Sequence, residues 1–305
     1  MGKVAFVFPG QGAQYPGMGK ELAEVSPAAA NVFRMADEIR PGTSGQCFAG
    51  SEEQLKETKI TQPCMFAVEQ AAAAALAEAG IHADMAAGFS LGELSALCYT
   101  GIVDTSTSFE LVCRRGELMQ EAAQKFNTSM VAVVRLDNET VEQVCSQFEG
   151  VYPVNYNCPG QVSVAGRSEV MAEFSAAVKA AGGRAIPLKV SGGFHSPFMA
   201  EAAEEFGKLL EKVDFNHPAV PLYSNCTGLP YEGDVKELLA KQICSPVRWE
   251  SIVRHMIASG ADTFIEVGPG NVLCGLISKI DKNVRTFGVS DKESLEKCIA
   301  EVKSC

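Results

Sequence analysis

The sequence predicts an α/β fold, and three features of its pattern indicate it. Short β-branched and apolar runs alternate with helical stretches along all 305 residues. The composition is 47% hydrophobic and 21% charged, which suits a large core that needs no disulfide or metal. Residues 128–190 depart from simple alternation and read β-α-β-β-α-β, the order of a ferredoxin-like unit. We therefore expect a larger α/β domain, residues 1–127 and 191–305, with a ferredoxin-like subdomain, 128–190, inserted into it.

Apolar runs, caps and turn glycines place the elements of the larger domain. Asp104 is a good N-cap for one helix, and Gly80 stops another. In chain order we expect a strand at Lys3–Phe8, a helix at Gln62–Ala79, a strand at Met85–Gly88, helices at Leu91–Thr100 and from Asp104 to about Lys125, a strand at Thr263–Val267, a helix at about Val272–Ile280, a strand at Thr286–Val289 and a last helix from Asp291.

The same signals divide the inserted unit into six elements. Its two central strands flank a turn at Pro159-Gly160. In order they are a strand at Met130–Leu136, a helix at about Glu139–Phe148, strands at Val151–Asn155 and Gln161–Ala165, a helix at Ser168–Ala181 and a strand at Arg184–Val190.

The charge balance and the cysteines bound the class of protein. Lys and Arg number 26 against 37 Asp and Glu, a net charge of −11, which disfavours non-specific binding to nucleic acid or anionic membranes. The 11 cysteines contain no CxxC pair, so neither a disulfide framework nor a zinc ribbon is indicated. The N-terminus lacks the apolar core of a signal peptide, and no apolar run approaches a membrane span. We expect a cytoplasmic monomer.

A candidate nucleophile lies where a strand meets a helix. Gly88-Phe89-Ser90-Leu91-Gly92 matches G-x-S-x-G in the strand-to-helix context that this motif requires. The helix N-terminus then directs N–H groups toward the place where an oxyanion would form. The simpler alternative is a glycine-flanked serine that caps a helix.

A serine hydroxyl needs a base, and the chain has four histidines. His82 is only eight residues before Ser90, His217 sits beside Pro218, and His255 lies within a helix. His195 follows the last strand of the inserted unit and a glycine pair, so we favour it as the base. No Asp or Glu stands out as a third member, and a backbone carbonyl can orient the imidazole instead.

Arg115 is placed on the apolar face of its helix. Residues three and four apart share a face, and those around Arg115 are Leu111, Val112, Leu118 and Met119. A buried guanidinium is unfavourable unless it meets an anion. The anion is either a structural partner, Glu93 or Asp104, or a carboxylate that arrives with the substrate.

Eight short motifs together resemble the malonyl-CoA:acyl carrier protein transacylases of type II fatty acid synthesis, over essentially the whole chain. In order they are Phe8-Pro9-Gly10-Gln11-Gly12, Gln62-Pro63, Gly88-x-Ser90-Leu91-Gly92-Glu93, Arg115-Gly116, Asn157-Cys158-Pro159-Gly160-Gln161, Phe194-His195-Ser196, Pro246-Val247-Arg248-Trp249 and Glu266-Val267-Gly268-Pro269-Gly270. The resemblance implies an α/β hydrolase-like large domain with an inserted ferredoxin-like domain.

The same resemblance implies a site and a reaction. Malonyl-CoA would acylate Ser90 with His195 as base, and the phosphopantetheine thiol of acyl carrier protein would then take the malonyl group, without metal or cofactor. Arg115 would hold the malonyl carboxylate. The N–H groups of Gln11 and Leu91 would form the oxyanion hole, with the side chains of Gln11 and Gln62 nearby. The backbone carbonyl of Arg248 would orient His195.

Two residues depart from the family pattern, and the acceptor stays open. Arg248 stands where glutamine is usual, and Phe89 stands where histidine is common, either as a packing variant or with altered acyl preference. Carrier proteins are acidic, so docking on this acidic chain needs a local basic patch, for which Lys189 and Arg184 are candidates. The alternatives are a serine hydrolase, an acyltransferase that serves a polyketide synthase, and a non-catalytic binding module.

Overall fold

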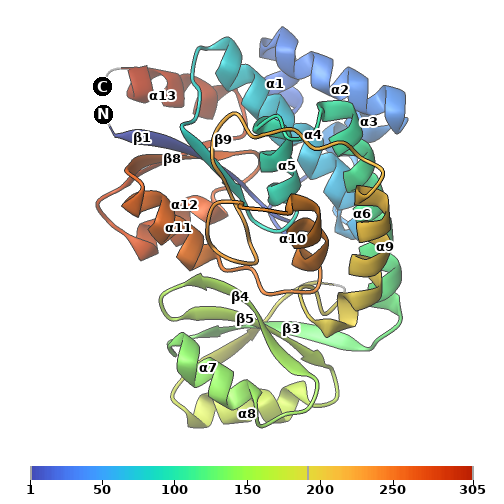
Figure 1. Ribbon diagram of the computed structural model, residues 1–305, viewed down its shortest axis with the longest axis vertical. Coiled ribbons are helices and arrows are strands. Elements are labelled where there is room, and N and C mark those ends of the chain that lie inside the picture. Colours follow the sequence, from blue (N-terminus) through green and yellow to red (C-terminus); the bar gives the residue numbers. More distant parts are fainter. Residues whose placement is uncertain (1, 191, 304–305) are drawn as a thin grey trace.

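The computed structural model describes residues 2–190 and 192–303 of the chain (Figure 1). Met1, Ser191, Ser304 and Cys305 lie outside the described residues, and the predicted boundary at residue 191 falls among them.

A five-stranded parallel sheet forms the centre of the larger part, with the strand order β7-β2-β1-β8-β9. Its strands are β1 (Lys3–Phe8), β2 (Met85–Gly88), β7 (Leu222–Tyr223), β8 (Ala261–Val267) and β9 (Arg285–Val289). The unbroken apolar run of β1 has a simple reason, since a parallel strand in mid-sheet is buried on both faces. Phe6 and Phe8 face one hydrophobic core, while Ala5 and Val7 face another.

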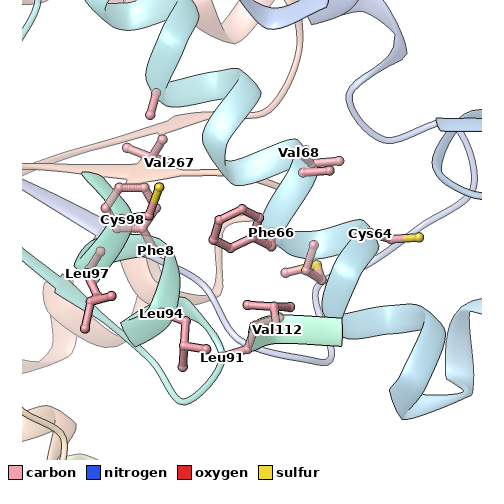
Figure 2. Close-up of a cluster of buried hydrophobic side chains, with 14 of the residues drawn as sticks. Phe8, Cys64, Phe66, Val68, Leu91, Leu94, Leu97, Cys98, Val112 and Val267 are labelled. Atoms are coloured by element: carbon pink, nitrogen blue, oxygen red, sulfur yellow. The ribbon is translucent and has the colours of Figure 1, made fainter. Parts of the chain in front are cut away.

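Helices cover both faces of this sheet. The larger core contains residues of α4 (Thr58–Glu78), α5 (Gly92–Tyr99) and α6 (Thr105–Gln124), and the second core contains residues of α11 (Trp249–Ala258) and α12 (Val272–Ile280). Figure 2 shows part of the larger core, in which Phe8, Phe66 and Leu94 lie near one another. The other helices of this part are α1 (Lys20–Val25), α2 (Pro27–Ile39), α3 (Thr43–Ala49), η1 (Gln54–Lys56), η2 (Pro197–Met199), α9 (Ala200–Leu210), α10 (Val235–Gln242) and α13 (Lys292–Lys303).

A separate antiparallel sheet has the strand order β4-β5-β3-β6. Its strands are β3 (Thr128–Val134), β4 (Val151–Cys158), β5 (Gln161–Arg167) and β6 (Arg184–Pro187), and its helices are α7 (Asn138–Cys145) and α8 (Met171–Ala180). Both helices pack into one core with the sheet and lie on the side away from the parallel sheet (Figure 1). The predicted α/β fold is confirmed, with a parallel sheet and a separate antiparallel one. The division into domains at residues 127/128 and 190/191 stays a prediction.

Most expected elements are present, with ends that differ by a few residues. The two strands Lys3–Phe8 and Met85–Gly88 and the helix Val272–Ile280 have the predicted bounds, and the Asp104 side chain caps α6 through the Thr107 N–H at 3.0 Å. Helix α4 begins at Thr58, four residues before the predicted start, so Pro63 lies inside it, where its missing N–H removes one helical hydrogen bond. Strand β6 ends at Pro187, three residues before its predicted end at Val190.

Two further features concern the state of the cysteines and the length of the apolar helices. The ten cysteines among the described residues are free thiols, most of them buried. No helix in the described part of the chain combines the length and apolar character needed to cross a bilayer.

The β2–α5 turn requires two glycines. A Cβ on Gly88 would lie 1.8 Å from the Gly92 carbonyl carbon, and a Cβ on Gly92 would lie 2.1 Å from the Phe8 carbonyl oxygen. Both obstacles are backbone atoms, which cannot move aside as a flexible side chain can. The start of α5 therefore packs directly on the end of β1.

We predict that Gly92→Ala lowers the free energy of unfolding by about 1–3 kcal/mol, because the new methyl group overlaps the backbone of β1. The matched control is Gly45→Ala in α3, where no atom lies within 4 Å of the added Cβ. That change should stabilise the helix by about 0.5–1 kcal/mol through helix propensity. Urea unfolding midpoints check both, and an equal effect of the two changes would contradict the prediction.

Candidate active site

Ser90 occupies a sharp turn between β2 and α5. Its φ of 56° lies in the left-handed region, which non-glycine residues seldom adopt and which is common at strained functional turns. The side chain is partly buried and lines a cavity. Helix α5 begins two residues later, so the positive end of its dipole points toward the serine.

His195 lies beside Ser90 in the structure. Its Nε2 is 2.7 Å from Ser90 Oγ, and its Nδ1 is 2.9 Å from the backbone carbonyl oxygen of Gln242. Because the carbonyl can only accept, Nδ1 carries the hydrogen and Nε2 is left to accept from the serine. The other histidines lie elsewhere: His82 and His217 are exposed, and His255 contacts the Gly228 carbonyl at 2.8 Å.

Burial governs the protonation of His195. The side chain is only 4% exposed, and this desolvation, with the nearby charge of Arg115, lowers its pKa to about 4. The imidazole is therefore neutral near pH 7 and free to accept a proton.

The carbonyl that orients His195 is that of Gln242, so the prediction that Arg248 supplies it is wrong. The Arg248 carbonyl accepts from the Ile252 N–H at 3.0 Å, because Arg248 is the N-cap of α11. Gln242 is the last residue of α10, where carbonyl groups lack helical donors and the dipole is negative. Both effects favour a bond from the imidazole N–H.

The guanidinium of Arg115 is fully buried and also reaches Ser90. Its Nη2 is 3.3 Å from Ser90 Oγ and donates to Gln242 Oε1 at 2.8 Å, while Nη1 donates to Gln62 Oε1 at 2.9 Å. Neither predicted structural anion pairs with it. The Glu93 carboxylate instead accepts from the Asn225 N–H at 2.9 Å and the Tyr231 hydroxyl at 2.7 Å.

Arg115 thus stays a cation without a carboxylate partner among the described residues. Asp104, the second candidate anion, caps α6. Burial lowers the pKa of Arg115 to about 10, partly offset by Glu93, so it remains charged at neutral pH. Burial raises the pKa of Glu93 to about 7.

A cavity of about 410 Å³ opens in front of Ser90. Gln11, Gln62, Leu91 and His195 line it, and none of the hydrogen bonds of the described residues uses the N–H of Gln11 or Leu91. The Gln11 amide donates to Thr58 Oγ1 at 3.4 Å, and the Gln62 amide contacts Met119 Sδ at 3.3 Å. The two N–H groups are therefore available to an oxygen bound in the cavity.

The remaining predicted residues are Phe89, Lys189 and Arg184, and the first two line this cavity. Phe89 lines it and packs on Trp249 with ring centroids 5.6 Å apart. Lys189 is exposed at its edge, whereas Arg184 is exposed but does not line it. Within the described ranges, no cluster of three or more His, Cys, Asp or Glu side chains could hold a metal ion.

Sequence reasoning missed two residues that contact the site, Gln242 and Asn225. The Gln242 side chain also donates to the Ser90 carbonyl at 2.6 Å, and the Asn225 side chain accepts from the Ser90 N–H at 2.7 Å. Asn225 follows β7, at the carboxyl edge of the parallel sheet where sites gather in α/β folds, and that rule could have found it. Gln242 acts partly through its backbone, which leaves no signal in a sequence.

Known proteins are similar to this chain over nearly its whole length. The sequence profile of a family described as "Acyl transferase domain" matches residues 5–299. The malonyl CoA-acyl carrier protein transacylase of Bacillus subtilis (strain 168) is 41% identical over 311 residues, which cover 99% of this chain and 98% of the relative. That of Escherichia coli (strain K12) is 38% identical over 303 residues, which cover 97% and 98%.

Solved structures are similar over the same extent. The malonyl CoA-acyl carrier protein transacylase from Clostridium perfringens Atcc 13124 has a TM-score of 0.96 at 37% identity, and the match covers 99% of this chain and 98% of that one. A malonyl-transacylase solved in complex with its type II PKS acyl-carrier protein has a TM-score of 0.94 at 35% identity, and the match covers 98% and 99%.

We predict that His195 stays neutral well below the usual range of histidine. Folded-state burial disfavours the imidazolium, so protonation should occur near pH 4 and not near 6.5. NMR titration of the ring nitrogens checks this. A His195 midpoint near 6.5 would contradict the prediction.

Proposed function

The chain belongs to the malonyl CoA-acyl carrier protein transacylases of the acyl transferase family, and we propose that it works by a ping-pong mechanism through a malonyl ester on Ser90. One observation carries the mechanism: Ser90 Oγ lies within hydrogen-bond distance of both a neutral imidazole and a buried cation, at the wall of a cavity.

The first half-reaction forms the ester. Nε2 of His195 takes the proton of the Ser90 hydroxyl as the oxygen attacks the thioester carbonyl of malonyl-CoA. The imidazolium that results donates through Nδ1 to the Gln242 carbonyl, at the negative end of α10. The tetrahedral intermediate then collapses, the C–S bond breaks, and the CoA thiolate leaves with the proton from His195.

The N–H groups of Gln11 and Leu91 stabilise the oxyanion. Both residues line the cavity beside Ser90, and Leu91 is the N-cap of α5, so the helix dipole adds positive potential. In comparable enzymes one such donor contributes about 10²–10³ in rate.

Arg115 selects an acyl group that ends in a carboxylate. The substrate carboxylate replaces neutral amide oxygens as acceptor of the guanidinium, which gives the buried cation the anionic partner that the protein does not supply. An acetyl group lacks this charge and gains nothing from Arg115.

The second half-reaction transfers malonate to the carrier. The phosphopantetheine thiol of acyl carrier protein loses its proton to His195 and attacks the ester carbonyl, and Ser90 recovers its hydroxyl proton from the imidazolium. No metal or cofactor takes part in these steps. Exposed Lys189, at the cavity edge, offers a cation to the acidic carrier. Arg184 precedes it in the chain, at the start of β6.

We predict that the protein incubated with malonyl-CoA gains the mass of one malonyl group on Ser90. Ser90→Ala should gain none, and the control Ser106→Ala, a change on the solvent side of α6, should label fully. Intact-mass spectrometry followed by peptide mapping checks this, and addition of carrier protein should discharge the ester. An unlabelled wild-type protein, or labelling that survives Ser90→Ala, would contradict the covalent mechanism.

Arg115→Ala should reduce malonyl transfer by about 30-fold to several-thousand-fold, since truncating one partner of a buried charge pair costs about 2–5 kcal/mol. Acetyl transfer should fall little. The matched control is Arg114→Ala on the same helix, whose exposed guanidinium pairs with Glu117. Transfer assays with both thioesters check this, and equal losses on the two acyl groups would count against the carboxylate role.

A further inference from the structure

The side chain of Asn225 contacts the backbone of the turn that carries Ser90. Its side-chain Nδ2 donates to the Gly88 carbonyl at 2.6 Å, and its Oδ1 accepts from the Ser90 N–H at 2.7 Å. One amide group therefore bridges the residues on either side of Phe89. We propose that Asn225 is a positioning residue, which holds the strained turn in the conformation that presents Ser90 Oγ to His195.

The backbone of Asn225 is itself fixed from two sides. Its N–H donates to Glu93 Oε1 at 2.9 Å, and its carbonyl accepts from the Arg248 N–H at 2.9 Å. Tyr231 holds the same Glu93 oxygen at 2.7 Å, and the side chains of Asn225 and Glu93 are completely buried. The backbone of Asn225 is thus bonded to a residue of α5 and to the N-cap residue of α11.

The turn needs such a support because it is strained and tight. Ser90 has a φ of 56°, and a non-glycine residue in a sparsely populated conformation costs about 1–3 kcal/mol. Gly92 allows the close approach of β1, and Gly88 allows that of the start of α5, but neither contributes a side-chain bond. Asn225 satisfies the two polar groups that the turn leaves over, a carbonyl at the end of β2 and an N–H before α5.

The bond to Ser90 also decides which N–H groups face the cavity. Since the Ser90 N–H is taken by Asn225 Oδ1, the next N–H along the chain, that of Leu91, is the one left for an oxyanion. The inference rests on the proposed function, because positioning matters only if Ser90 reacts.

Two substitutions separate the donor from the acceptor. Asn225→Leu has a similar size and makes neither bond. Asn225→Asp makes both when the carboxyl is protonated, since that group has one O–H donor and an acceptor oxygen, but an ionised carboxylate can only accept and faces the Gly88 carbonyl. The activity of Asn225→Asp relative to wild type should therefore rise as the pH falls.

The experiment is stopped-flow acylation by malonyl-CoA between pH 5.5 and 8. We expect Asn225→Leu to acylate about 10²-fold more slowly with an unchanged KM, the loss typical of a small misplacement of a reacting group. The relative rate of Asn225→Asp should increase at least tenfold from pH 8 to pH 5.5. The rate of Asn225→Asp is divided by the wild-type rate at the same pH, which removes the effect of titratable groups that both proteins contain. Those around this position are Glu93, Tyr231, Cys226, Arg115 and His195.

A stability control separates positioning from folding. Ser26→Ala removes the cap of α2, a helix whose residues do not line the cavity, and should lower the melting temperature while the acylation rate stays at the wild-type value. If Asn225→Leu does not fold, Asn225→Asp alone decides. The inference would be overturned if Asn225→Leu acylated at the wild-type rate, or if only its KM changed. A relative rate of Asn225→Asp that does not change with pH would also overturn it. A wild-type protein that forms no ester would instead overturn the proposed function.

Discussion

The site depends on a buried positive charge that the protein leaves without a carboxylate partner. The guanidinium of Arg115 is held by the neutral amide oxygens of Gln62 and Gln242 and touches Ser90 Oγ. Neutral acceptors satisfy its hydrogen bonds but do not balance its charge, and a buried cation is costly in that state. The same charge helps to keep His195 neutral. In the proposed mechanism, this one side chain therefore both prepares the base and binds an anionic substrate.

Two helix termini place opposite potentials on the two sides of Ser90. In the proposed mechanism, the N-terminus of α5 lies on the side where negative charge develops on the substrate. The C-terminus of α10 receives the imidazole N–H, where that mechanism develops positive charge. Because these dipoles belong to the folded backbone, they need no reorientation during the reaction. This arrangement explains why a backbone carbonyl can take the place of the carboxylate of a catalytic triad.

Gln242 connects these features through three bonds. Its carbonyl accepts from His195, its Oε1 accepts from Arg115, and its Nε2 donates to the Ser90 carbonyl. Asn225 holds the same turn through bonds to the Gly88 carbonyl and the Ser90 N–H. The Gln242 amide carries no charge, so it can be buried beside the cation of Arg115 and the neutral imidazole of His195 without adding a further charge to the site.

The sequence alone determined the α/β class, the β-α-β-β-α-β order of the inserted unit, the turn with Ser90 and the inward direction of Arg115, because each follows from local periodicity or spacing. It also placed His195 ahead of three other histidines. Tertiary structure alone decided that Gln242 and not Arg248 orients the imidazole, and that Glu93 and Asp104 leave Arg115 without an ion pair. The contacts of Gln242 with His195 and of Glu93 with Asn225 join residues 47 and 132 positions apart, and a backbone carbonyl looks the same at every position, so no local pattern could distinguish them.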